Sequence, residues 1–107
     1  MHFVVIARDE PSGEARKRMR AAHLDFVAGR QSDIVYAGPL IEGERMVGSL
    51  FVFDLPDRAA LDRYMAQDPY FTAPIFASVE IFESRWIVPE REAGFLRAEA
   101  ELARQSS

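Results

Sequence analysis

The chain has 107 residues, close to the size of one domain; 49% of them are hydrophobic and 28% are charged. With 13 basic and 17 acidic residues its net charge is −4, which argues against a nucleic-acid partner, because such a protein needs a basic face to neutralise phosphates. The absence of cysteine excludes disulfides, thiolate nucleophiles and cysteine-ligated metals.

The first part of the chain predicts a strand, a helix and a second strand. Residues 2–7 are β-branched and aromatic, which indicates a buried strand, and this run is too short for the apolar region of a signal peptide. Because no stretch approaches the roughly 20 apolar residues of a membrane span, we expect a cytoplasmic protein with no membrane partner. Ser12 is expected to cap a helix that ends at Gly29. Residues 33–38 predict the second strand, which Gly38-Pro39 should end.

The second part predicts two more strands and two more helices. Residues 46–55 form the third strand, and Asp57 should cap the following helix, which Pro69 ends. Residues 79–88 predict the fourth strand. An amphipathic pattern over residues 90–104 predicts a last helix.

This order of elements predicts an α+β fold of the ferredoxin-like βαββαβ type. Its antiparallel sheet has the order 4-1-3-2 with two helices on one face. We expect this domain to span residues 1–88, with residues 89–107 as a C-terminal helical extension.

The third predicted strand indicates a homodimer. Leu50 and Val52 point to one face of the sheet while Phe51 and Phe53 point to the other, so both faces are apolar. Two helices cover only one face, and a second copy packed sheet to sheet would cover the other, as in a dimeric α/β barrel. The C-terminal helix is the competing cover, and assembly beyond a dimer stays open.

His23 is the most informative candidate for catalysis. It follows Arg16 and Arg20 at spacings that place all three side chains on one flank of the first helix. A neutral imidazole can act as a general base, although a buried histidine that only completes a hydrogen-bond network is the alternative. Asp68 or Asp9 could orient this imidazole, and both also fit ordinary turn chemistry.

Two glycine-containing pairs, Gly38-Pro39 and Gly48-Ser49, flank the predicted hairpin of the second and third strands. A glycine inside a strand often marks a bulge or a close approach of two backbones. Ser49 could donate a hydrogen bond into a pocket, but it lacks the context of a nucleophilic serine. With one usable histidine and scattered carboxylates, we expect no metal site and no cofactor.

An ordered set of short motifs resembles the YCII-related, or YciI-like, family over residues 1–88. The motifs are FVVIARDEPSG, Arg16–Arg20–Ala22-His23-Leu24, Ala37-Gly38-Pro39-Leu40, Gly48-Ser49-Leu50, and Asp68-Pro69-Tyr70 followed by Val79-Glu80-Ile81. The chain departs from the usual pattern at Glu10, where the family has a basic residue, and at Pro74, where it often has glycine.

The resemblance implies a dimeric α+β barrel and an active site with a histidine–aspartate dyad, carried here by His23 and Asp68. A few members of the family are linked to dehydrochlorination of chlorinated hydroxyquinols, and most have no established activity. Three hypotheses follow. The first is a cofactor-free enzyme for elimination, isomerisation or hydrolysis of a small molecule, with Arg16 or Arg20 holding an anionic substrate. The others are a non-catalytic ligand-binding or assembly module and, least favoured, a metal-assisted enzyme.

Overall fold

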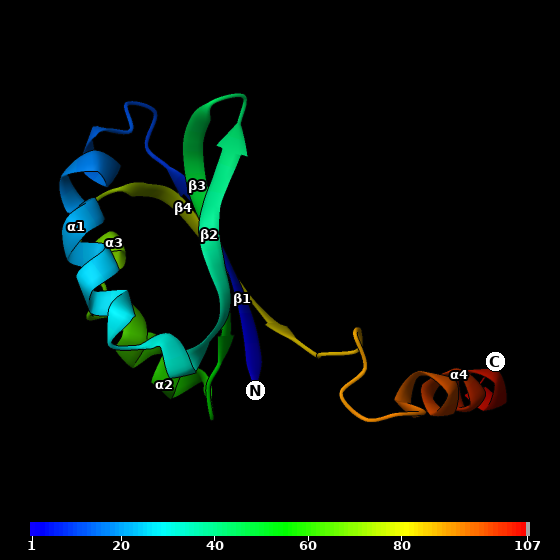
Figure 1. The fold of residues 1–107 in the computed structure, drawn as a ribbon. Helices are drawn as coiled ribbons and strands as arrows, with labels where there is room; N and C mark the ends of the chain where they lie inside the picture. The colour runs from blue at the N-terminus through cyan, green and yellow to red at the C-terminus, as the bar shows by residue number, and fades with distance from the viewer. Residues whose placement is uncertain (107) are drawn as a thin grey trace.

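The computed structural model describes residues 1–106 as one four-stranded sheet with helices on one side and a separate C-terminal helix (Figure 1). The elements in chain order are β1 (His2–Asp9), α1 (Glu14–Ala28), the 3-10 helix η1 (Gln31–Asp33), β2 (Ile34–Glu42), β3 (Arg45–Asp54), α2 (Arg58–Met65), α3 (Pro69–Thr72), β4 (Phe76–Ser84) and α4 (Phe95–Ser106). No helix in this part of the chain is long and apolar enough to span a bilayer.

The sheet has the order β2-β3-β1-β4 with all neighbours antiparallel, which confirms the predicted ferredoxin-like topology. The central strands β1 and β3 pair through seven positions, from His2 opposite Asp54 to Arg8 opposite Gly48. Helices α1, α2 and α3 all lie on the same face of the sheet (Figure 1). The one-turn helix α3 is an addition to the two helices that the sequence predicts on this face.

The core lies between this face and the helices. Phe3 and Val5 of β1 and Phe51 and Phe53 of β3 are buried there, together with Leu61 and Tyr64 of α2. Asp57 caps α2 as predicted, because its side chain accepts a hydrogen bond from the Ala60 amide at 2.8 Å.

The opposite face of the sheet, which we call the outer face, is also apolar. Its cross-strand neighbours are Val4 with Val52 and Phe82, and Ile6 with Leu50. Phe82 is 49% exposed, and the other four are only partly buried. Helix α4 does not cover this face, because it lies well away from the sheet (Figure 1). No helix of residues 1–106 therefore covers the outer face in a single copy of the chain.

The two edge strands differ from their predicted bounds. Strand β2 continues through Gly38-Pro39 to Glu42, because a proline is tolerated in an edge strand, where its missing N–H removes no bond on the open side. Strand β4 begins at Phe76 and ends at Ser84, rather than spanning residues 79–88. Ser84 pairs with His2, and β1 offers no residue beyond that position to continue the ladder.

The helix ends also correct three predictions. The N-cap of α1 is Gly13, at φ 70°, and not Ser12, which accepts only a bond from the Glu14 amide. Helix α2 ends at Met65, before Pro69 is reached, and Pro69 instead begins α3, since proline fits the first turn of a helix. The last helix begins at Phe95 and not at residue 90, because the Glu90 carboxylate accepts bonds from the Gly94 amide just before the helix and from the Leu96 amide in its first turn, and so caps it.

Candidate functional site

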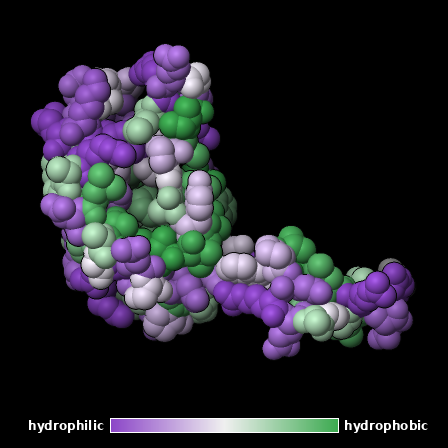
Figure 2. Space-filling model, viewed as in Figure 1, coloured by the Kyte–Doolittle hydropathy of each residue, from purple (hydrophilic) through white to green (hydrophobic). Residues whose placement is uncertain are grey.

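A pocket of about 250 Å³ opens between α1, β2 and β3, and Figure 2 shows the domain hollowed between α1 and β2. Six of the eight residues singled out from the sequence line it: Arg16, Arg20, His23, Gly38, Pro39 and Ser49. The other lining residues are Leu24, Val27, Ala37, Phe51 and Tyr70. The pocket is thus a mainly apolar slot with a histidine, a serine and two arginines.

Asp68 lies behind the pocket wall and holds His23 in place. Its carboxylate is fully buried, and its Oδ1 atom lies 2.8 Å from His23 Nδ1. Oδ1 also accepts a hydrogen bond from the Tyr70 amide at 2.9 Å, which is the N-cap bond of α3. Since Asp68 caps the short helix beside α1, the turn at Asp68-Pro69 is what brings this carboxylate to His23.

Tyr64 completes the network around Asp68. Its hydroxyl donates to Asp68 Oδ2 at 2.9 Å. Burial raises the pKa of the Tyr64 hydroxyl, and the charge of Asp68 raises that pKa further, so Tyr64 stays protonated and remains a donor. Three donors therefore converge on one carboxylate. With an ionised Asp68 this arrangement assigns the His23 proton to Nδ1 and leaves the Nε2 lone pair unused.

The Nε2 atom of His23 is open to a ligand. It makes no hydrogen bond within residues 1–106, and it is not sealed from solvent. His23 itself is only 8% exposed, so access to it runs through the pocket that it lines. A histidine in this position can take a proton from a bound molecule, or give one to it.

Tyr70 forms one wall of the pocket and stacks on His23. The two rings lie parallel with their centroids 3.7 Å apart. The Arg16 guanidinium also contacts Tyr70, at 4.9 Å from the centroid of its ring. Within the described residues the Tyr70 hydroxyl is buried without a hydrogen-bond partner. Tyr70 is thus both a buried residue of the domain and part of the pocket wall.

Arg16 and Asp9 form a buried ion pair beneath the pocket. Arg16 Nε lies 2.6 Å from Asp9 Oδ2, and the side chains are only 6% and 4% exposed. Arg16 Nη2 also donates to Ser49 Oγ at 2.6 Å, which leaves the Ser49 hydroxyl proton available to a ligand. Asp68, and not Asp9, is therefore the partner of His23, and Asp9 does not line the pocket.

The close approach of two backbones that a glycine in a strand predicts is confirmed at Gly48. A Cβ atom at this position would collide with the carbonyl oxygen of Ala7, because β1 and β3 approach closely next to Ser49. A β-bulge also interrupts the pairing of β2 with β3 beside it, at Leu40 and Ile41. Gly48 thus lets the strand carry Ser49 into the pocket floor.

Sequence reasoning missed the apolar lining and the Tyr64 hydroxyl. Leu24 and Val27 lie one turn beyond Arg20 and His23 on α1, so helical spacing could have found them. Tyr64 precedes Asp68 by four residues, which is also a detectable spacing. Among residues 1–106 no three histidine or carboxylate side chains gather as a metal site would require.

Comparison with known families decides where the chain belongs. The model of the YCII-related domain matches residues 1–85, which include every strand of the sheet and every residue of the pocket. The chain belongs to the YCII-related family. Glu10 and Pro74, at which the chain departs from the usual pattern of the family, do not line the pocket. No protein with a curated function matches this YCII chain.

Several solved structures share the fold of this YCII chain. One is 5-chloro-2-hydroxyhydroquinone dehydrochlorinase (TftG) from Burkholderia phenoliruptrix AC1100, in complex with 2,5-dihydroxybenzoquinone, with 23% identity and a TM-score of 0.72 over 81% of this chain and 94% of that one. PA3566 from Pseudomonas aeruginosa has 16% identity and a TM-score of 0.53 over 81% and 93%. Rv0793 from Mycobacterium tuberculosis has 21% identity and a TM-score of 0.51 over 82% and 99%. These likenesses show the ferredoxin-like fold alone.

Proposed function

We propose that this YCII protein is a cofactor-free enzyme that acts on a small molecule by proton transfer, with His23 and Asp68 as a dyad. The observation that carries the proposal is the hydrogen bond of 2.8 Å between His23 Nδ1 and a fully buried Asp68, with Nε2 left free at the pocket. Asp68 fixes the tautomer of His23 and stabilises the imidazolium that forms when Nε2 takes a proton. Elimination, isomerisation and hydrolysis all use such a group.

A dehydrochlorination illustrates how the dyad would work. Nε2 takes a proton from a ring hydroxyl of a chlorinated hydroxyquinol and returns it to the ring carbon that carries chlorine. Chloride then leaves as a second hydroxyl loses its proton, and the ring becomes a hydroxyquinone. The overall change is the loss of HCl: the ring is oxidised while the C–Cl bond is replaced by C–H, so no external oxidant is needed.

The charges around the pocket favour an anionic substrate that meets Arg20. Arg16 is already neutralised by Asp9, so its guanidinium adds little net charge. Arg20 is exposed at the pocket, and within the described residues it forms no ion pair. Arg45 lines the adjoining groove with Arg20 and adds positive charge, whereas Lys17 there is paired with Glu14 and Glu44 contributes a carboxylate. A phenolate or carboxylate would therefore place its charge near Arg20 and its ring over the apolar wall.

We also propose that the protein is a homodimer in which two outer faces pack together. Val4, Ile6, Leu50, Val52 and Phe82 form a continuous apolar patch across three strands, and no helix of the same copy covers it. Such a patch is unusual on a monomer that stays in water. A two-fold dimer would bury it, and assembly beyond two copies would need another surface.

The enzyme proposal is tested with 5-chloro-2-hydroxyhydroquinone as the probe, by following chloride release and quinone absorbance. We expect turnover by the native chain and a loss of at least about a hundredfold in His23→Gln, because general acid–base catalysis contributes about that much. Asp25→Asn, an exposed change on the same helix, is the control and should keep full activity. Since substrate preference can differ within a fold, a panel of related anionic phenols and carboxylic acids is screened in parallel by NMR for shifts at the pocket residues. Ligands that bind in the pocket while none is converted would refute the enzyme proposal and favour a binding module.

A further inference from the structure

The C-terminal segment of the chain stands outside the domain. After β4 ends at Ser84, residues 85–94 lead away from the sheet, and no residue of α4 is buried. The radius of gyration is 16.7 Å. A compact domain of this length would have a value of about 13 Å. The helix is thus an extended arm, which Figure 1 shows on the opposite side of the sheet from α1 and α2.

Helix α4 has the pattern of a helix that packs against something. Phe95, Leu96 and Leu102 give it a mainly apolar side that also carries Glu99, while Arg97, Glu101 and Arg104 lie on the opposite side of the helix. Leu102 is 57% exposed in a single copy. An isolated helix of 12 residues is marginal in water, so most of its stability must come from tertiary or quaternary packing.

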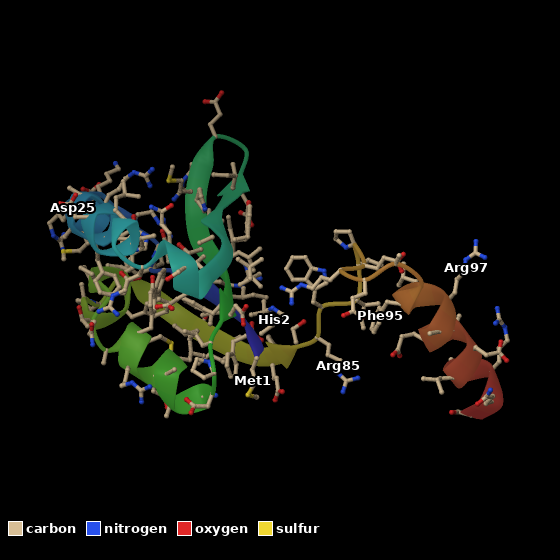
Figure 3. The ribbon with its side chains drawn as sticks, turned by 60° about the horizontal axis from the view of Figure 1, so that its bottom comes forward. Met1, His2, Asp25, Arg85, Phe95 and Arg97 are labelled. Atoms are coloured by element: carbon tan, nitrogen blue, oxygen red, sulfur yellow. The ribbon has the colours of Figure 1, made fainter. Side chains whose placement is uncertain are left out.

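The segment before α4 is held in a definite shape, so the arm has a definite direction. Trp86 donates from Nε1 to the Pro89 carbonyl at 2.6 Å, and the Arg91 guanidinium lies 4.2 Å from the Trp86 ring centroid. Glu90 then caps α4. In Figure 3, His2 and Arg85 lie where the segment leaves the sheet, while Phe95 and Arg97 lie beyond it on α4.

The base of this segment forms a groove of about 410 Å³ along the outer face. His2, Val4 and Val52 line one side, and Trp86 and Ile87 line the other. The Nε2 atom of His2 is buried there without a hydrogen-bond partner within residues 1–106, since Asp54 Oδ2 lies 3.9 Å away. A buried polar atom without a partner indicates that something is missing from this surface in a single copy.

We propose that α4 is an arm that packs its apolar side on a second copy of this chain, beside the outer-face contact. The inference rests on the sheet-to-sheet dimer of the proposed function and adds the arm to it. A copy that covers the outer face must lie on the side to which the arm extends (Figure 1). The partner of α4 and the partner of the outer face are then the same molecule, and two-fold symmetry makes the exchange reciprocal.

The size of the outer face supports this occupant. Four strands of 8 to 10 residues give a sheet face with a footprint of roughly 600 Å². A standard stable interface buries about 800 Å² on each partner. Reciprocal packing of two arms supplies the additional apolar area that the sheet face alone lacks.

The first test compares the dimer dissociation constant of full-length variants by sedimentation equilibrium. The double change Leu96→Ala and Leu102→Ala keeps high helix propensity and removes the apolar side chains, so we expect dimerisation to weaken at least about tenfold. Arg97→Ala is the matched control, because Arg97 points into open space in Figure 3, and its dimer should be as tight as the native one.

The second test asks whether the arm binds its own copy or another. The chain has no cysteine, so Gln105→Cys gives a single site for a spin label. Spin-labelled copies that contain no ¹⁵N are mixed with ¹⁵N-labelled copies that carry no spin label. We expect the amide resonances of the ¹⁵N-labelled copies to broaden.

The outcomes separate the two proposals. A native chain that is monomeric at high concentration overturns both the dimer and the arm. A dimer that neither weakens in the leucine variant nor shows broadening between copies overturns the arm and leaves the sheet-to-sheet dimer standing. Weakening together with broadening between copies establishes the arm.

Discussion

Replacing Asp68 by asparagine separates the charge of this residue from its shape. Oδ1 of Asp68 receives the protons of His23 Nδ1 and of the Tyr70 amide, and Oδ2 receives that of the Tyr64 hydroxyl. The Tyr70 amide can only donate, so the asparagine oxygen must take the place of Oδ1. Its NH₂ group then faces Tyr64, whose hydroxyl can turn to accept. We therefore expect Asp68→Asn to leave the His23 proton on Nδ1.

The charge is what the substitution removes. Hydrogen bonds to a charged group contribute about 1 kcal/mol more than neutral ones, and three such bonds are affected. Because burying a neutral amide also costs less than burying a carboxylate, the net loss of folding free energy should be about 2 kcal/mol. For a protein of this size that corresponds to a decrease in Tm of roughly 10 °C.

The same charge should matter more for turnover than for folding. A carboxylate about 4 Å from the imidazolium stabilises it by about 4 kcal/mol at an effective dielectric constant of about 20. The loss of this stabilisation would lower kcat by as much as roughly a thousandfold, with little change in KM.

Three measurements check this reasoning. Long-range ¹H–¹⁵N correlation spectra of the imidazole report the tautomer, urea unfolding reports stability, and the chloride assay reports turnover. Asp62→Asn is the control, since Asp62 forms an exposed pair with Arg58 and should change stability by less than about 1 kcal/mol. A proton that moves to Nε2 of His23 in Asp68→Asn, or a stability equal to that of the native chain, would refute the role that we assign to the three donors.

Three further predictions concern the supports of the site. Gly48→Ala should destabilise the fold by about 2 kcal/mol or more in urea unfolding, because its Cβ meets the Ala7 carbonyl and strand backbones cannot easily move apart; unchanged stability would contradict that close approach. Arg16→Met should lower the free energy of unfolding by about 3–5 kcal/mol, because it leaves Asp9 buried and unpaired. Adding Asp9→Leu should recover most of this stability, and equal stabilities of the single and double variants would argue against the ion pair. Folding raises the pKa of Tyr64 above its usual 10.0, so above that pH the hydroxyl ionises in the unfolded chain while it stays protonated in the folded one. The contribution of the protonated Tyr64 to folding stability is therefore complete below pH 10.0 and is lost as the pH rises above it. Urea midpoints measured against pH should show this alkaline decrease less steeply in Tyr64→Phe, and the same slope in both proteins would speak against it.

Local patterns in the sequence were enough to determine the elements, their order and the face of α1 that carries the site. The spacing of Arg16, Arg20 and His23 predicts one helical flank, and all three side chains do line one pocket. Period-two patterning likewise predicts the two apolar faces of β3, because alternation along a strand needs no knowledge of its neighbours. The family resemblance added the pairing of His23 with Asp68.

Tertiary structure alone decided which groups meet. The choice between Asp9 and Asp68 as the partner of His23 depends on how α1 packs against α3, and a separation of 45 residues in sequence carries no such information. The ends of β4 depend on the length of β1, because a strand pairs only as far as its neighbour extends. Exclusion of α4 from the outer face was equally beyond the sequence, since an amphipathic pattern shows that a helix needs a partner but does not show which surface provides it.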